Sequence, residues 1–287
     1  MDAAIDLLAT LDPFAGGGGA RAPGLRRYLL LDVFSDAPLR GNQLAVFTDG
    51  RGLEAERMQL IARELNLSET VFMLPARSGG DVRIRIFTPG SELPFAGHPV
   101  LGSAIVAGLG LRRSSVALET EAGIVPVELA RGEGRARSGR MEQPIPTWRE
   151  YERAGELLAA LGVERSLLPV EIYDNGPHHV YVTLGSEEEV ARLAPDMRGL
   201  LALGEVEANC FAGSGSRWKT RMFAPAVGVP EDPATGSAAG PLALHLARHG
   251  QIAFGEQIEI SQGAEINRPS TLYAQADGSA DALERVT

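Results

Sequence analysis

One long internal repeat limits the folds open to this chain more than any other feature of its sequence. The stretch HPVLGSA at residues 98–104 returns as DPATGSA at residues 232–238. The preceding segments agree too, because RIFTPGSELPFAG (85–97) and RMFAPAVGVPED (221–232) each run from an apolar stretch through Pro to a turn. Solenoid proteins repeat many short units, so a single period of about half the chain excludes that class. The repeat predicts two similar halves that face a shared cleft.

Hydrophobic patterning predicts alternating strands and helices around the repeat. Short apolar runs predict strands at RYLLLDVF, LAVFTD, ETVFMLPA and DVRIRIFTP. GLEAERMQLIARELNL carries apolar residues at helical spacing, with acidic residues early, as a helix N-terminus prefers. Each repeat copy then runs into small apolar residues, VLGSAIVAGLGL and SAAGPLALHLARHG. These two segments predict two buried helices.

Composition excludes several classes of partner. The chain has 37 acidic and 27 basic residues and a formal net charge of −10, which argues against nucleic acid or an anionic membrane as the main partner. A locally positive pocket for a small anion stays compatible with this balance. The single cysteine, Cys210, allows no intramolecular disulfide and suits a cytoplasmic location. We also expect no signal peptide and no membrane span, and we interpret residues 1–27 as a flexible N-terminal extension because of their GGGG run.

The repeated turn supplies the first candidate site residues. Ser103 and Ser237 are expected to cap the helices that Gly-Ser-Ala opens, and the glycine before each serine allows a ligand to approach the backbone. Two helix starts aimed at one cleft would hold a carboxylate or a developing oxyanion. His98 and Asp232 lead the two copies and are candidates for acid–base or hydrogen-bonding roles. The alternatives are ordinary capping for the serines, a turn residue ahead of Pro233 for Asp232, and a structural imidazole for His98.

Glu69 is the remaining candidate for proton transfer. It stands in NLSETVF, at the head of an apolar strand, where a carboxylate is costly unless it has a function. Partial burial raises the pKa of a carboxyl group, which suits a general acid or base near neutral pH. The alternative is a residue at the strand start that points to solvent.

A second histidine pair has a spacing that metal sites use. His245 and His249 are separated by four residues on a predicted helix. They stand at its C-terminal end before Gly250, where the helix dipole favours histidine, and HLARH contains no carboxylate. We therefore predict no metal site.

Taken together, the motifs resemble those of the PhzF-like family of isomerases related to phenazine biosynthesis. The segments DVFSDAPLRGNQLAVF, LNLSETVF, RIFTPGSELPFAGHPVLGSA, EDPATGSAAG and SQGAEINRPS stand in that order. The resemblance covers about residues 28–276, and PFAGHP and EDPATGSA are its specific part. It departs at Gln43, where the family usually has Pro, a change we interpret as one of turn rigidity or of the pocket rim.

The resemblance implies a fold and an activity. The fold is diaminopimelate-epimerase-like, an α/β (α+β) architecture of two pseudo-symmetric halves, each a curled, mostly antiparallel sheet around a central helix. The expected halves are residues 28–141, joined by a strand near 270–276, and residues 142–269. The implied activity is isomerisation of trans-2,3-dihydro-3-hydroxyanthranilate, or of a related carboxylate in secondary metabolism, without cofactor or metal. A cytoplasmic homodimer is expected.

The resemblance also implies residue roles. Glu69 would carry a proton from one carbon to another, while His98, Asp232 and Ser237 would hold and polarise the substrate. The expected substrate-binding residues are Gly97, Gly236, Ser103, Thr235 and Asn42. Two-thiol racemisation is excluded, because the repeated turns contain no cysteine. Two alternatives stay open: a non-catalytic small-molecule-binding or interaction protein on the same fold, and a lyase or cyclase that uses the same base.

Overall fold

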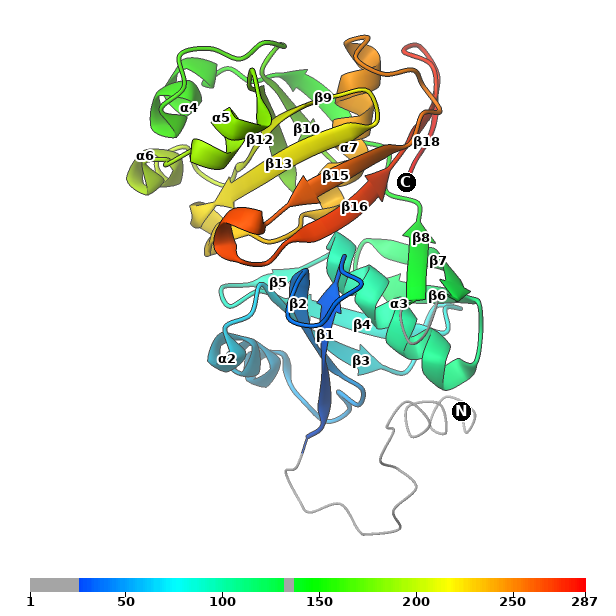
Figure 1. Ribbon diagram of the computed structural model, residues 1–287. Coiled ribbons are helices and arrows are strands. Elements are labelled where there is room, and N and C mark those ends of the chain that lie inside the picture. Colours follow the sequence, from blue (N-terminus) through cyan, green and yellow to red (C-terminus); the bar gives the residue numbers. More distant parts are fainter. Residues whose placement is uncertain (1–25, 132–136) are drawn as a thin grey trace. The chain divides into compact units, whose positions relative to one another are not determined.

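The computed structural model describes residues 26–131 and 137–287, and these fall into two compact units (Figure 1). The first unit takes the chain up to Asp36 and from Gln43 to Glu142, and the second takes Ala37–Asn42 and Gln143–Thr287. The predicted extension at residues 1–27 lies almost wholly outside the described residues. The short segment Ala37–Asn42 belongs to the second unit, although the chain on either side of it belongs to the first. Residues 270–276, which we expected to join the N-terminal half, lie in the second unit.

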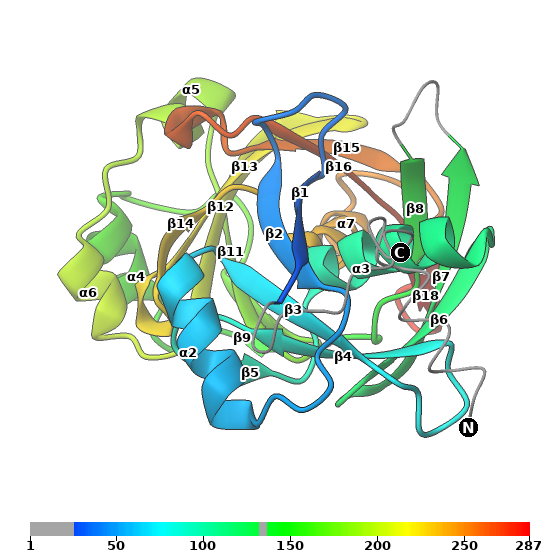
Figure 2. The same ribbon diagram turned by 90° about the horizontal axis from the view of Figure 1, so that it is seen from below.

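The first unit is a mixed sheet curled around one helix. The strand order is β1-β2-β3-β4-β6-β7-β8, with β5 paired to β4. The strands are β1 (Tyr28–Val33), β2 (Asn42–Phe47), β3 (Glu69–Leu74), β4 (Val82–Phe87), β5 (Glu92–Leu93), β6 (Ser115–Thr120), β7 (Gly123–Arg131) and β8 (Arg137–Met141). Helix α3 (Gly97–Leu111) packs against β1, β3, β4 and β6–β8 and lies inside the curve (Figure 2). Helix α2 (Ala55–Leu65) packs on β3 and β4.

Helix α3 is hydrophobic all round because it is enclosed. Its first twelve residues, Gly97–Gly108, are all buried apart from Ile105, and Val100 and Ala104 belong to the main core of the unit. Small residues let the sheet approach closely: a Cβ on Gly102 would come 2.6 Å from Cδ2 of Leu44. The small-residue composition that predicted a buried helix therefore reflects close packing.

The second unit repeats this design. Its sheet has the order β16-β15-β13-β12-β11-β10-β9, with β14 paired to β13. The strands are β9 (Thr147–Glu150), β10 (Glu171–Asp174), β11 (His178–Thr183), β12 (Glu207–Ser214), β13 (Arg217–Ala224), β14 (Val229–Asp232), β15 (Ile258–Gln262) and β16 (Ser270–Ala274). Helix α7 (Gly236–Arg248) takes the place of α3. The smaller elements are α4 (Ala154–Leu161), α5 (Glu187–Arg192), α6 (Met197–Leu201), the 3₁₀ turns η1 (Pro225–Val227) and η2 (Ala264–Ile266), and the hairpin β17 (Ala276–Gly278)–β18 (Leu283–Val286).

Strand pairing confirms the two similar halves. In the first unit β2 runs parallel to β3, β3 antiparallel to β4, and β4 parallel to β6. In the second unit β11 runs parallel to β12, β12 antiparallel to β13, and β13 parallel to β15. A short strand follows in each half, where β5 folds back on β4 and β14 folds back on β13, and it leads into the central helix.

An ion pair braces the short strand in both halves. Arg85 on β4 makes a bidentate pair with Glu92, with both N···O distances 2.6 Å. Arg221 on β13 makes the same pair with Glu231, with both distances 2.8 Å. These pairs show which residues of the two copies are structurally equivalent, and Glu92 corresponds to Glu231.

The strand register corrects our alignment of the repeat. Leu93 pairs with Ile86 on β4, and Asp232 pairs with the corresponding Met222 on β13. Asp232 is therefore equivalent to Leu93, and matching it with His98 was wrong. Counting onward from these positions, ELPFAGH (92–98) corresponds to EDPATGS (231–237), and the central helices begin at the equivalent glycines 97 and 236. The shared letters Gly-Ser-Ala lie inside α3 in the first copy and at the start of α7 in the second, so they do not occupy equivalent positions.

The predicted serine caps are also wrong. Ser103 is the seventh residue of α3, and the N-cap position is held by Ala96. Thr235 holds that position in α7, and neither N-cap residue makes a side-chain cap hydrogen bond. Helix α3 starts earlier than predicted because a proline is compatible with the first turn, where its missing N–H has no helical partner, so Pro99 does not delay the helix.

Candidate active site

Glu69 and His98 meet in the first unit. Glu69 is the first residue of β3, and His98 is the second residue of α3, the helix that β3 packs against. Nε2 of His98 lies 3.2 Å from Oε2 of Glu69, within ion-pair distance, although the two atoms are not aligned as a hydrogen bond. The sheet therefore brings the predicted proton carrier against the predicted imidazole.

Burial keeps the His98 imidazole neutral. His98 is 4% exposed, and loss of solvation lowers the pKa of its ring to about 3, although a hydrogen bond to the backbone of Gln43 works in the opposite direction. Because this hydrogen bond raises the pKa, it stabilises the protonated ring, so the ring is the donor. Since Nε2 faces Glu69, Nδ1 carries the proton toward the Gln43 carbonyl, and Nε2 presents its lone pair to the Glu69 carboxyl group.

Gln43 contacts the His98 ring through its backbone. It lies in strand β2 and not in the preceding turn. The bond from His98 is to the backbone of Gln43, so a residue of any side chain can supply it. The departure from the family pattern at Gln43 thus leaves the His98 contact in place.

The second unit holds the Asp232 carboxylate through both oxygens. Asn42 donates its side-chain amide to Oδ1 at 2.9 Å, and the Thr235 hydroxyl donates to Oδ2 at 2.6 Å. Asn42 also donates to the carbonyl of Ala234 at 2.9 Å. All of these side chains are buried. Asn42 and Thr235, predicted to bind substrate, are engaged with Asp232 here.

A proline shapes the start of α7. Pro241 lies inside the helix and cannot donate a backbone hydrogen bond to the carbonyl four residues earlier. Buried side chains donate to the carbonyls of the first three helical residues: Gln143 to that of residue 236 at 2.7 Å, Asn175 to that of 237 at 2.9 Å, and Tyr181 of β11 to that of 238 at 2.6 Å. The bond from Asn175 reaches the carbonyl that Pro241 leaves without its helical donor. These bonds fix the carbonyls of the first turn. The backbone N–H groups of Gly236 and Ser237 lie at the helix start, where the helix itself supplies no acceptor for them.

The predicted site residues thus fall into two groups. Glu69, Gly97 and His98 stand together at one end of α3, while Ser103 lies one turn further along, buried in the helix. Asn42, Asp232, Thr235, Gly236 and Ser237 stand together at the β14–α7 turn of the other unit. Sequence reasoning missed Gln143, Asn175 and Gln262, which hold that turn, because their contacts span 27 to 93 residues.

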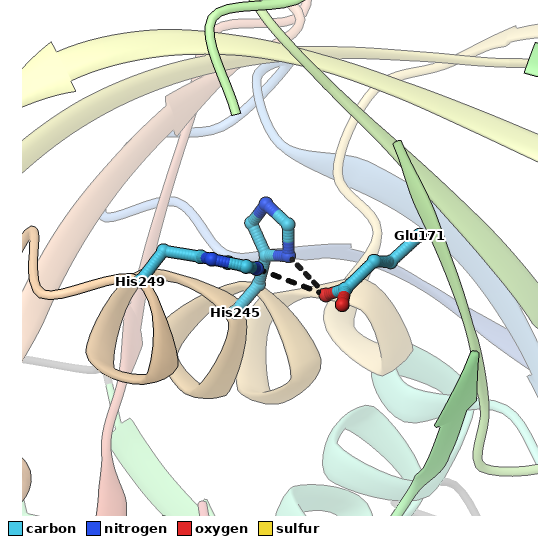
Figure 3. A group of neighbouring side chains, drawn as sticks. All are labelled: Glu171, His245 and His249. Carbon is cyan, nitrogen blue, oxygen red and sulfur yellow. Dashed lines mark hydrogen bonds and ion pairs between the residues drawn. The ribbon is translucent and has the colours of Figure 1, made fainter. Parts of the chain in front are cut away.

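A carboxylate joins the histidine pair that we had excluded as a metal site. Figure 3 shows Glu171, from β10, directed at His245 on α7 and at His249, the C-cap residue of that helix. One ligand atom from each lies within 4.8 Å of the others, and Oε2 of Glu171 is 3.2 Å from Nδ1 of His245 and 3.1 Å from Nε2 of His249. The Arg248 guanidinium lies 2.7 Å from the same Oε2 and supplies the compensating positive charge. We interpret the cluster as an ion pair that fastens the end of α7 to the sheet.

Comparison with known proteins identifies the family. Residues 31–287 match the family model for phenazine biosynthesis-like proteins. The chain is 55% identical, over 262 residues, to the trans-2,3-dihydro-3-hydroxyanthranilate isomerase of Pseudomonas chlororaphis, covering 91% of this chain and 94% of that protein. The chain belongs to the phenazine biosynthesis-like family. Isomerases of the same name from Pseudomonas aeruginosa and Pseudomonas fluorescens are each 53% identical over the same share of the chain, and this member of the family is an isomerase.

Solved structures confirm the epimerase-like fold of the family. A predicted epimerase from Pseudomonas aeruginosa has a TM-score of 0.77 and 32% identity, over 91% of this chain and 95% of that chain. A probable proline racemase from Agrobacterium radiobacter shares the fold at a TM-score of 0.62 and 14% identity, over 91% and 88%. Within residues 26–131 and 137–287, none of the helices is long and apolar enough to span a membrane.

Proposed function

We propose that this protein isomerises trans-2,3-dihydro-3-hydroxyanthranilate and that Glu69 is the group that moves the proton. The observation that carries the proposal is the Glu69–His98 contact of 3.2 Å beside an imidazole held neutral by burial. A neutral imidazole places no fixed positive charge beside the Glu69 carboxyl group, so nothing from His98 holds that group permanently ionised and it can take up and release a proton. The 55% identity to an isomerase of that name supports the choice of substrate.

The proposed reaction is a proton transfer between two carbons of one molecule. The Glu69 carboxylate takes a proton from a ring carbon, and the electron pair of that C–H bond enters the adjacent π system. The same carboxyl group returns the proton to a different carbon, so substrate and product have the same composition. His98 would accept a hydrogen bond from the Glu69 carboxyl group in its protonated state and so fix its orientation.

Asp232 and the start of α7 are proposed to bind the other polar groups of the substrate. The amides of Gly236 and Ser237 provide partial positive charge at a helix N-terminus, which suits the substrate carboxylate. Asp232, held by Asn42 and Thr235, is an acceptor suited to an amino or hydroxyl group. The amide of Gly97 is the equivalent group in the first unit.

The experiment is turnover in D₂O followed by NMR. The wild type, Glu69→Gln and the control Glu64→Gln, which removes an exposed carboxylate from the same unit, are incubated with trans-2,3-dihydro-3-hydroxyanthranilate. Wild type and control are expected to form product and take up deuterium at one carbon. Glu69→Gln should fold normally and lose about 10²- to 10⁴-fold in kcat. Equal turnover by Glu69→Gln refutes the role of Glu69, and no turnover by the wild type refutes the substrate.

A cytoplasmic location and a homodimer are also proposed. The single cysteine, buried in β12, supports the location, and the family resemblance supports the dimer. Light scattering coupled to size-exclusion chromatography tests the dimer, since a monomer mass at micromolar concentration would contradict it.

A further inference from the structure

Gln262 is the centre of a hydrogen-bond network behind the Asp232 turn. It is the last residue of β15 and is 4% exposed. Its Nε2 donates to the Asp232 carbonyl at 2.9 Å and to Oγ1 of Thr235 at 3.0 Å. Its Oε1 accepts from the backbone N–H of Thr235 at 3.2 Å and from the hydroxyl of Thr220 at 3.1 Å. One buried side chain thus makes four hydrogen bonds, three of them to the turn.

These partners fix the orientation of the Gln262 amide. The backbone N–H of Thr235 can only donate, and the backbone carbonyl of Asp232 can only accept, so the amide oxygen and nitrogen cannot exchange places. The nitrogen therefore donates to the Thr235 hydroxyl oxygen. The single hydrogen of that hydroxyl is then directed to Oδ2 of Asp232, 2.6 Å away. Gln262 thus orients the Thr235 hydroxyl so that it donates to Oδ2 of Asp232.

The backbone next to Gln262 also lies directly against the turn. Gly263 has a φ of +78°, and a Cβ at this position would come within 2.4 Å of the Pro233 carbonyl. Gln262 itself pairs with Ser270 in the β15–β16 ladder. A side chain at the end of a paired strand is more rigidly placed than one on a loop.

Among the described residues of the first unit, the position equivalent to Gln262 makes no such network. By the strand register, Ile260 of β15 corresponds to Leu118 of β6, so Gln262 corresponds to Thr120. The Thr120 hydroxyl bonds to the carbonyl of Gly123 in the next turn, 2.9 Å away. In that half the position of Asp232 is taken by Leu93, which has no carboxylate to orient. The network therefore occurs in the half that carries the carboxylate.

We propose that Gln262 is a positioning residue of the active site. It fixes the turn from Asp232 to Thr235, so that the Asp232 carboxylate and the first amides of α7 keep one orientation toward the substrate. This inference rests on the role proposed above for Asp232. Gln262 acts through Thr235 and Asp232, and its effect is expected on kcat more than on KM, because a misplaced polar group costs most in the transition state.

The test compares Gln262→Met, which keeps the length of the side chain and removes its hydrogen bonds, with Thr235→Val and the double variant. Gln275→Met is the control, since it removes an amide that bonds Asp277 at 2.6 Å in the same unit, away from the turn. Gln262→Met is expected to lower kcat by about 10- to 100-fold. The double variant should lose much less than the product of the two single losses, because both changes act on one network. Fully multiplicative losses, or a Gln262→Met protein as active as the control, would overturn the inference.

Hydrogen exchange supplies a readout that needs no substrate. The backbone amide of Thr235 bonds to Oε1 of Gln262, so its exchange measured by NMR should accelerate about 10-fold or more in Gln262→Met, while amides in the middle of α7 stay protected. Unchanged exchange at Thr235 would overturn the inference. If the wild type does not turn over the named substrate, the proposed function fails, and the exchange rates still decide whether Gln262 holds the turn.

Discussion

Replacing His98 by Gln should make the stability of the fold less sensitive to acid. The unfolded chain binds a proton at this imidazole with a pKa near 6.5, whereas burial lowers the pKa in the folded protein to about 3. Between these values the unfolded state binds more protons, so the free energy of unfolding falls as the pH falls. Above pH 6.5 both states hold a neutral ring and the effect vanishes.

The size of the effect follows from the two pKa values. Each pH unit below 6.5 costs about 1.4 kcal/mol until the folded value is reached, so His98 should remove roughly 2.5 kcal/mol between pH 7.5 and 4.5. Glutamine does not titrate. The pH dependence of unfolding in His98→Gln should be shallower than that of the wild type by this amount, and the other titrating groups cancel in the comparison.

Urea unfolding followed by far-UV circular dichroism measures the difference. Tryptophan fluorescence is unsuitable, because Trp148 and Trp218 both lie in the other unit. NMR of the five histidine rings gives an independent check, since the signal lost in His98→Gln identifies the ring. A His98 ring that titrates near pH 6.5, or equal pH dependences of the two proteins, would refute the reasoning that burial keeps this imidazole neutral.

Two further predictions concern stability. Burial alone would raise the pKa of Glu171, but hydrogen bonds from His245, Arg248 and their neighbours outweigh this effect and hold the pKa well below its usual range. The carboxylate therefore stabilises the fold above about pH 4.3, and this contribution is lost as the pH falls. Glu171→Gln should lower the free energy of unfolding by about 2–3 kcal/mol at pH 7, measured by tryptophan fluorescence, and equal stability at pH 7 would contradict it. Gly102→Ala places a Cβ 2.6 Å from Leu44 and should cost about 1–3 kcal/mol, measured by circular dichroism; an unchanged urea midpoint would show that the core yields.

The sequence by itself determined the duplicated architecture and supplied the candidate site residues. Apolar alternation, as in VRIRIF at 82–87, and small-residue helices are local patterns, and they suffice to specify strands and enclosed helices. A carboxylate at the head of an apolar strand and an imidazole beside a helix start are costly in a core, so Glu69 and His98 could be chosen as candidates from their surroundings in the chain.

Only the tertiary structure decided how the two copies correspond. The matching letters Gly-Ser-Ala paired His98 with Asp232, whereas the backbone pairing of β5 with β4 and of β14 with β13 makes Asp232 equivalent to Leu93. The contacts of Gln262 and Glu171 could not be predicted from the sequence either. Gln262 reaches Asp232 across 30 residues and Glu171 reaches Arg248 across 77, and such contacts leave no periodic pattern in the chain. Hydrogen bonds between distant residues depend on how strands register and helices pack, and that information exists only in the folded molecule.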